Sequence, residues 1–97
     1  MQDNKKYPPI HVLNVMRGFK EPRFRYPITP YRFELQSGER HRVREIRQMH
    51  REKVGRGYHY HFVLKTREDR YFHIAFDTAA LVWRLIQEVD EQLFFHN

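Results

Sequence analysis

The stretch Gly57–Thr66, GYHYHFVLKT, and the segment Arg70–Asp77 that follows it, RYFHIAFD, decide the fold class because both alternate in side-chain character. A period of two is typical of a strand that turns one face to a core. If Thr66 faces Arg70 across the loop Arg67–Asp69, large apolar side chains meet on one face, and a one-residue slip would separate them. The pairs that this register joins are Phe62 with Ile74, Leu64 with Phe72, and Tyr60 with Phe76. The sequence therefore predicts an antiparallel hairpin with this register.

Further strands are expected before this hairpin. Ile10–Met16 is rich in β-branched residues, and Tyr31–Gln36 alternates strictly between apolar and polar side chains. Ser37-Gly38 then predicts a tight turn into a returning strand, Arg40–Ile46. These segments favour an antiparallel sheet that the later hairpin extends.

A bulge and an exposed linker are expected in the middle of the chain. Val43 and Ile46 are three residues apart, so they share one face of a strand only if a bulge lies near Arg44. The segment Gln48–Gly57 is charged and contains Gly55 and Gly57, which predicts an exposed linker.

The C-terminal segment has two interpretations. Val82, Ile86 and Val89 follow helical spacing, whereas a strand over 82–87 would place Trp83 and Leu85 on one face. We expect the strand. The predicted fold is mainly β: a small antiparallel sheet or open barrel of about five to six strands, with the C-terminal segment as a strand or a short helix. We expect residues 1–9 to form a flexible N-terminal arm and residues 10–97 to form a single domain.

Several short motifs resemble a group of small bacterial proteins of unknown function. The motifs are HRVREI, an aromatic strand that ends in Thr66, the segment RYFHIAFD, and a tryptophan six residues after Asp77 in FDTAALVWRLIQEVDE. The resemblance covers about residues 9–91 and implies a small β-rich barrel in which residues 82–87 form a strand. It departs from the group at TAALV, where those proteins tend to have a turn with Gly or Asp. It implies no activity.

Composition narrows the class of protein. The 97 residues include no cysteine, which excludes disulfides and thiolate chemistry, and no apolar run approaches the roughly 20 residues of a membrane span. A cytoplasmic protein without membrane contact is expected. The formal net charge is +6, and Arg40–Arg56 alone carries seven basic and two acidic residues. A concentrated positive charge of this kind predicts an anionic partner.

The basic segment predicts contact with the phosphates of RNA or DNA. Arg40, Arg42 and Arg44 project together on a strand at intervals of roughly 6.6–7 Å, which is comparable to the phosphate repeat of a nucleic-acid strand. The residues predicted to bind nucleic acid are Arg40, Arg42, Arg44, Arg47, Arg51, Lys53, Arg56 and Tyr58. The spacing Arg40-x-x-x-Arg44, repeated as Arg47-x-x-x-Arg51, also resembles the arginine pair of PilZ-type cyclic-dinucleotide receptors and would suit a small phosphorylated ligand, but the companion D/N-x-S-x-x-G element is absent.

Tyrosines are the candidate platforms on which bases would stack. The alternation predicts that Tyr31 and Tyr60 lie in the core, which leaves Tyr26, Tyr58 and Tyr71 for stacking.

Other functional classes have weaker support. No nucleophile elbow, phosphate-binding glycine loop or suitably spaced pair of carboxylates is present, so we do not expect an enzyme. The alternative to nucleic-acid binding is a protein–protein adaptor or a homodimer that uses a sheet edge and Phe94 and Phe95.

Histidines gather on the second face of the predicted hairpin. In the register above, His59 lies opposite Asp77, and His73 is a diagonal neighbour of His61. Three imidazoles and a carboxylate within reach are the ligand types that zinc takes. Because this chain scatters seven histidines along its length, we expect no metal and no cofactor, and we treat His59, His61, His73 and Asp77 as candidates only.

Overall fold

The computed structural model describes residues 7–90, which form an all-β protein with six antiparallel strands. The strands are β1 (Pro9–Met16), β2 (Ile28–Glu34), β3 (Arg40–Val54), β4 (Gly57–Thr66), β5 (Tyr71–Asp77) and β6 (Val82–Val89). Each strand pairs with the next, and β6 returns to pair with β1, so the sheet closes into a barrel. The predicted β class and strand number are confirmed. No segment within residues 7–90 is a helix long and apolar enough to cross a membrane.

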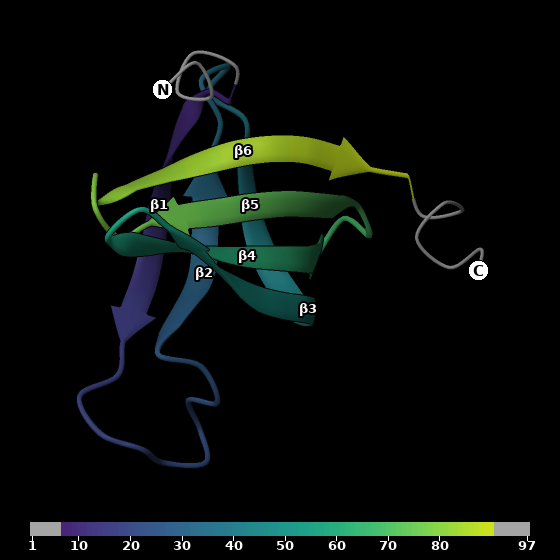
Figure 1. Ribbon diagram of the computed structural model, residues 1–97. Helices are drawn as coiled ribbons and strands as arrows, with labels where there is room; N and C mark the ends of the chain where they lie inside the picture. The colour runs from purple at the N-terminus through teal and green to yellow at the C-terminus, as the bar shows by residue number, and fades with distance from the viewer. Residues whose placement is uncertain (1–6, 91–97) are drawn as a thin grey trace.

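Strand β3 is long because it belongs to two groups of strands: one half of the barrel consists of β1 and β2, and the other of β4, β5 and β6. Figure 1 shows β1 and β2 running steeply across the direction of β4, β5 and β6. The first residues of β3 pair with β2, and from Val43 onward the strand pairs with β4. The register shifts at Arg44 and again at Arg47, so the predicted bulge is confirmed and a second one follows it. Such bulges bend a strand, which lets β3 pass from one half to the other.

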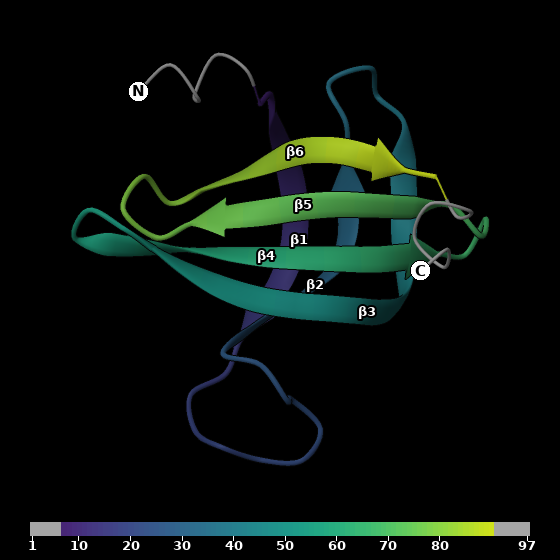
Figure 2. The same cartoon turned by 45° about the vertical axis from the view of Figure 1, so that its right-hand side comes forward.

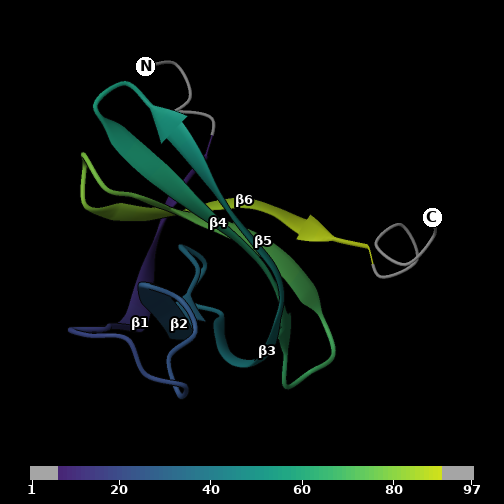
Figure 3. The same ribbon diagram turned by 60° about the horizontal axis from the view of Figure 1, so that its bottom comes forward.

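The segment predicted as a linker, Gln48–Gly57, is instead the end of β3, a turn and the start of β4. Backbone pairing with β4 continues to Val54, and Gly55 takes the positive φ of the turn, 58°. The prediction was wrong because pairing with β4 holds this segment extended, while most of its charged side chains are exposed. The resulting β3–β4 hairpin lies beside the β5–β6 turn (Figures 2 and 3).

The β4–β5 hairpin has the predicted register. Tyr60 pairs with Phe76, Phe62 with Ile74, and Leu64 with Phe72. Five of these six side chains are buried, and Tyr60 packs against them from the edge of the core. The C-terminal segment is the strand β6, with Trp83 and Leu85 in the core as the strand interpretation predicts.

The first residues of the chain that the structure describes make hydrogen bonds with β6. Arg84 donates a hydrogen bond to the carbonyl of Tyr7 (2.9 Å), and the amide of Leu85 donates to the carbonyl of Pro8 (2.9 Å). Strand β1 then begins at Pro9. Residues 1–6 of the predicted arm lie outside the described residues.

One end of the barrel holds a network of charged side chains around a buried histidine. The ring of His41 lies between Phe33 and Phe72, and its nitrogens contact Glu39 (2.9 Å) and Glu68 (3.2 Å). Arg70 binds Glu39 and also makes two hydrogen bonds to Glu88, of 2.8 and 2.9 Å. The hydrogen bonds from Arg70 lower the pKa of both Glu39 and Glu88, and the bond from His41 lowers the pKa of Glu68.

Replacement of Gly57 by alanine is expected to destabilise the protein. A Cβ at this position would lie 2.7 Å from Oγ1 of Thr78, the atom that accepts a hydrogen bond from the Tyr58 amide (2.9 Å). The clash and the loss of that bond are expected to cost about 1–3 kcal/mol in urea unfolding. Gly18→Ala is the matched control because no atom lies within 4 Å of its added Cβ. Equal stability of the two variants would contradict the tight contact.

Candidate functional site

The outer face of β2 and β3 carries two cross-strand pairs of side chains. Glu34 pairs with Arg40, and Arg32 pairs with Arg42. In the first pair, Nε of Arg40 lies 3.7 Å from Oε1 of Glu34, so the two charges balance. The second pair places two exposed arginines directly opposite each other, and neither has an acidic partner within residues 7–90. The register between β2 and β3 thus creates a concentrated positive charge.

A third arginine lies beside this pair. The backbone amide of Arg67, in the β4–β5 loop, donates a hydrogen bond to the carbonyl of Arg42 (3.0 Å). The same region contains an open hollow of about 680 Å³ lined by side chains of β1, β2, β3 and this loop. Its charged lining residues include Arg32, Arg40, Arg42, Arg67, Glu34 and Glu68. We call the four arginines the arginine face, and their excess over the two glutamates suits an anion.

Two of the other predicted arginines are neutralised by acidic neighbours. Arg44 lies at the bulge, and its Nη1 is 3.1 Å from Oδ1 of Asp69. Nη1 of Arg47 lies 3.2 Å from a carboxylate oxygen of Glu45. Of the three arginines predicted to project together from β3, Arg42 is therefore the one without an acidic partner in the described part of the chain.

The remaining predicted residues gather at the tip of the β3–β4 hairpin. The guanidinium carbon of Arg51 lies 4.5 Å from the ring centre of Tyr58, and the ammonium of Lys53 lies 5.2 Å from it. Arg56 is exposed in the turn itself. The tip thus joins cations to an aromatic ring, the combination that nucleic-acid single strands bind.

Two tyrosine predictions were wrong. Tyr31 is 42% exposed because β1 and β2 shift register beside it, which displaces it from the alternation that predicted a core position. Tyr71 is 1% exposed, with the ammonium of Lys65 5.7 Å from its ring centre, so it offers no stacking surface. The ring of Tyr26 meets that of Phe62 edge to face in the core. Tyr58 therefore remains the best placed of the three stacking candidates.

The structure brings together all four histidine-face candidates. Nε2 of His59 lies 3.4 Å from Oδ2 of Asp77, and Nδ1 of His61 lies 2.8 Å from Nε2 of His73. A hollow of about 300 Å³ lies against these side chains, and Tyr7, Arg84 and Ile86 also line it. The histidines lie on the sheet face that the predicted register gave them, but they are half-buried.

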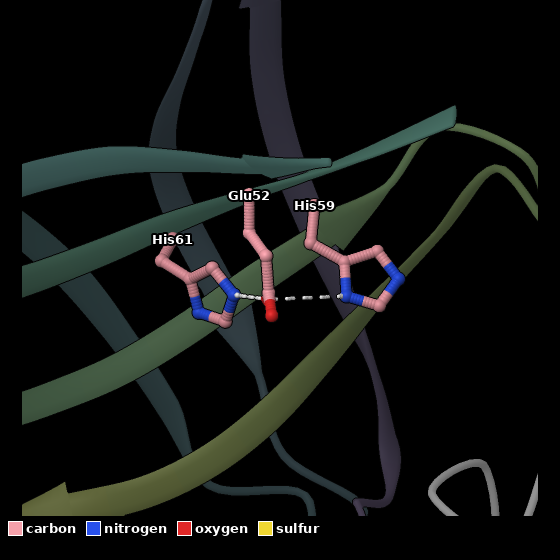
Figure 4. A group of neighbouring side chains, drawn as sticks. All are labelled: Glu52, His59 and His61. Atoms are coloured by element: carbon pink, nitrogen blue, oxygen red, sulfur yellow. Dashed lines mark hydrogen bonds and ion pairs between the residues drawn. The ribbon is translucent and has the colours of Figure 1, made fainter. Parts of the chain in front are cut away.

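Strand β3 adds two groups to the histidines. Oε1 of Glu52 lies 3.0 Å from Nε2 of His61 and 4.0 Å from Nδ1 of His59 (Figure 4). The ring of His50 stacks on that of His61, with ring centres 4.5 Å apart. We call Glu52, His59, His61, His73 and Asp77 the histidine cluster.

Burial governs the protonation of His61 and His73. Burial, followed by repulsion from His61 and His50, lowers the pKa of the His73 imidazole to about 4. Burial also lowers the pKa of His61, against the opposing effect of its hydrogen bond to Glu52. At neutral pH these imidazoles are therefore neutral, and each can donate through one nitrogen and accept through the other.

The sequence did not reveal Arg32, Arg67, His50 or Glu52 as members of these sites. Arg32 and Arg67 lie outside the basic segment, and only strand pairing places them beside Arg42. His50 and Glu52 lie in the segment that was interpreted as a linker. Their alternation as His50-Arg51-Glu52 is the one signal that would have placed both side chains on one face of a strand.

Comparison of the chain with protein-family models, curated proteins and solved structures gives no match. The resemblance to small bacterial proteins of unknown function therefore stays a prediction.

Proposed function

We propose that the protein binds nucleic acid through backbone phosphates at the arginine face. The observation that carries the proposal is the pair formed by Arg32 and Arg42, which are direct cross-strand neighbours without an acidic partner in residues 7–90. Like charges that face each other across a sheet are destabilising. A bound polyanion would relieve this repulsion and release its own counterions, which favours binding.

The spacing of the arginines also suits a phosphate backbone. Arg40 and Arg42 are two residues apart on β3, so their side chains leave the same face roughly 6.6–7 Å apart. Arg32 lies on the adjacent strand, at a separation of about 4.8 Å between strands. Arg67, which lines the same hollow, adds a further guanidinium. Consecutive phosphates of one strand can therefore each meet a guanidinium, which binds phosphate in a bidentate manner.

The tip of the β3–β4 hairpin supports a second contact with the same ligand. It lies at the far end of the strand that begins at Arg40, and Lys53 and Arg56 are exposed there. The ring of Tyr58, already in contact with cations, is the type of side chain on which an unpaired base stacks. This arrangement favours single strands over duplexes.

Fluorescence anisotropy with labelled single-stranded oligonucleotides of mixed sequence tests the proposal. We expect binding at about 50 mM salt that weakens steeply toward about 200 mM, because each phosphate contact on a single strand contributes a slope of roughly −0.7 in log affinity against log salt. Undetectable binding at the lower salt concentration, or binding that salt does not change, would rule the proposal out.

The double variant Arg32→Gln, Arg42→Gln is expected to reduce both affinity and salt dependence. Loss of two phosphate contacts should lower the slope by roughly 1.4 and weaken binding by on the order of tenfold or more at about 50 mM salt. Arg23→Gln, Arg25→Gln is the matched control, because it removes the same charge from exposed positions in the β1–β2 loop. If the two double variants lose affinity equally, net charge and not the arginine face drives binding.

Self-association is the second candidate function, and one observation favours it. Strand β1 pairs with β6 only at Pro9 and Ile10, which leaves the later residues of β1 without a strand neighbour on that side within residues 7–90. Leu13 and Met16, on the same strand, are 56% and 62% exposed. Phe94 and Phe95, which the sequence suggested for this role, lie outside the described residues. Light scattering at two concentrations distinguishes the candidates, since a stable dimer that does not bind oligonucleotides would favour self-association.

A further inference from the structure

The histidine cluster lies on a different part of the barrel from the arginine face and has no part in the proposed phosphate binding. Its members come from three neighbouring strands: Glu52 from β3, His59 and His61 from β4, and His73 and Asp77 from β5. The described part of the chain contains one group of three or more potential metal ligands that converge on one point, and it consists of Glu52, His59 and His61.

We propose that Glu52, His59 and His61 bind a zinc ion. Their ligand atoms, one carboxylate oxygen and two imidazole nitrogens, all lie within 4.8 Å of one another. Ligand atoms about 2.0–2.2 Å from a tetrahedral zinc are roughly 3.3 Å apart. The separations of 3.0 and 4.0 Å between Glu52 and the two histidines lie on either side of that value. Figure 4 shows the carboxylate between the two rings, so small side-chain rotations would bring the three atoms around one ion.

The second nitrogen of each ring has a partner of the kind that zinc-binding histidines have. When Nδ1 of His59 binds the ion, its Nε2 carries the proton and donates it toward Asp77, 3.4 Å away. Asp77 is itself held in place, since its Oδ1 accepts hydrogen bonds from the amides of Ala79 (2.9 Å) and Ala80 (3.0 Å). This carboxylate–histidine arrangement fixes the ring tautomer and orientation.

The other histidine is oriented in the same way. With Nε2 of His61 on the ion, its Nδ1–H donates to Nε2 of His73, 2.8 Å away. The ring of His50 stacks flat on that of His61, with an angle of 5° between the planes, and limits its rotation. Both imidazole ligands are thus oriented before any ion binds, which reduces the entropy that binding would cost.

Three protein ligands leave one tetrahedral position open. The hollow of about 300 Å³ beside the cluster has room for a water molecule or a small anion in that position, and Arg84 lines the same hollow. Sites with three protein ligands and one exchangeable position are those in which zinc binds or activates a small ligand, whereas purely structural zinc sites have four protein ligands. The cluster therefore fits an open zinc site. The sequence led to an expectation of no metal because the chain scatters its seven histidines along its length. Glu52, the ligand between the two histidines, was not a candidate because it lay in the predicted linker.

Calorimetric titration of the tag-free protein with zinc at about pH 7.5 tests the proposal. We expect one ion per chain, bound with a dissociation constant in the micromolar range or below. Glu52→Gln and His61→Ala are each expected to weaken binding at least tenfold, and Asp77→Asn by about 10- to 100-fold through His59. Glu52 is exposed, so its variant is expected to fold normally, which circular dichroism checks.

His11→Ala is the matched control, because His11 is an exposed histidine on β1 outside the cluster. It should bind zinc as the unmodified protein does. Absence of one-to-one binding, or equal affinity in the Glu52→Gln, His61→Ala and His11→Ala variants, would overturn the proposal.

Discussion

Phe62→Ala is expected to lower the unfolding free energy of this barrel by about 3–5 kcal/mol. Phe62 is 0% exposed, and its ring contacts those of Tyr26 and Trp83, with centres 6.0 and 5.7 Å away. It therefore joins β4 to β6 and to the segment before β2. The replacement removes most of a buried aromatic side chain and leaves a cavity that rigid strands on all sides cannot fill.

Urea unfolding followed by circular dichroism measures this change. Phe19→Ala is the matched control, since it removes the same atoms from a side chain that is 71% exposed, and we expect it to change stability by less than about 0.5 kcal/mol. A cost below about 1 kcal/mol for Phe62→Ala would mean that this residue does not lie at the centre of the core.

The metal-free protein is expected to lose about 2 kcal/mol of stability between about pH 6.5 and pH 4, because burial makes His73 and His61 resist protonation. The pKa of His73 is about 4 in the folded protein and about 6.5 when the chain is unfolded. Above about pH 6.5 the ring is neutral in both states and contributes nothing. As the pH falls below that value, the unfolded chain binds a proton that the folded chain does not, so stability falls until the folded pKa is reached.

The expected loss is smaller than the full shift in pKa would give, since His73 is only half-buried and solvent screens part of the effect. The lowered pKa of His61 acts in the same direction. Glu39, Glu68 and Glu88 also have lowered pKa values, but they lose their stabilising charge mainly below about pH 4.5. The range between about pH 6.5 and 5 therefore lies above the titration of these three carboxylates.

Urea unfolding in the presence of a chelator, at several pH values in that range, measures the slope of stability against pH. His73→Gln keeps a hydrogen-bonding side chain but cannot be protonated, so its slope should be clearly shallower than that of the unmodified protein. Identical slopes for the two proteins would show that His73 does not contribute to the pH dependence.

The sequence predicts the β4–β5 hairpin correctly because its two strands constrain each other. Five of the six large apolar residues are buried, and one register alone brings all six together. The end of β3 escaped prediction for the opposite reason. Residues 48–54 have little hydrophobic alternation. Their extended conformation comes from backbone pairing with β4, so the residues of the segment alone do not indicate it.

The same distinction applies to the candidate sites. Residues within one basic segment or one predicted hairpin were found, whereas residues that other strand pairings bring into the site were missed. Arg42 was predicted because it belongs to a dense basic segment, whereas Arg32 stands alone in its own strand and gains its importance from the register with β3. His59 and Asp77 were paired correctly, since the hairpin register follows from the sequence. Glu52 was missed because residues 48–57 were predicted to form a linker. A linker has no strand partner, so nothing in the sequence placed Glu52 beside His59 and His61.

Whether the arginine face binds the phosphates of nucleic acid is best measured by titrating isotope-labelled protein with a single-stranded oligonucleotide and following the backbone amide resonances. We expect the largest shifts at Arg32, Arg42 and Arg67, with little change at His61 and His73. Shifts confined to the histidine cluster or to the β1–β2 loop, with none at the three arginines, would contradict it.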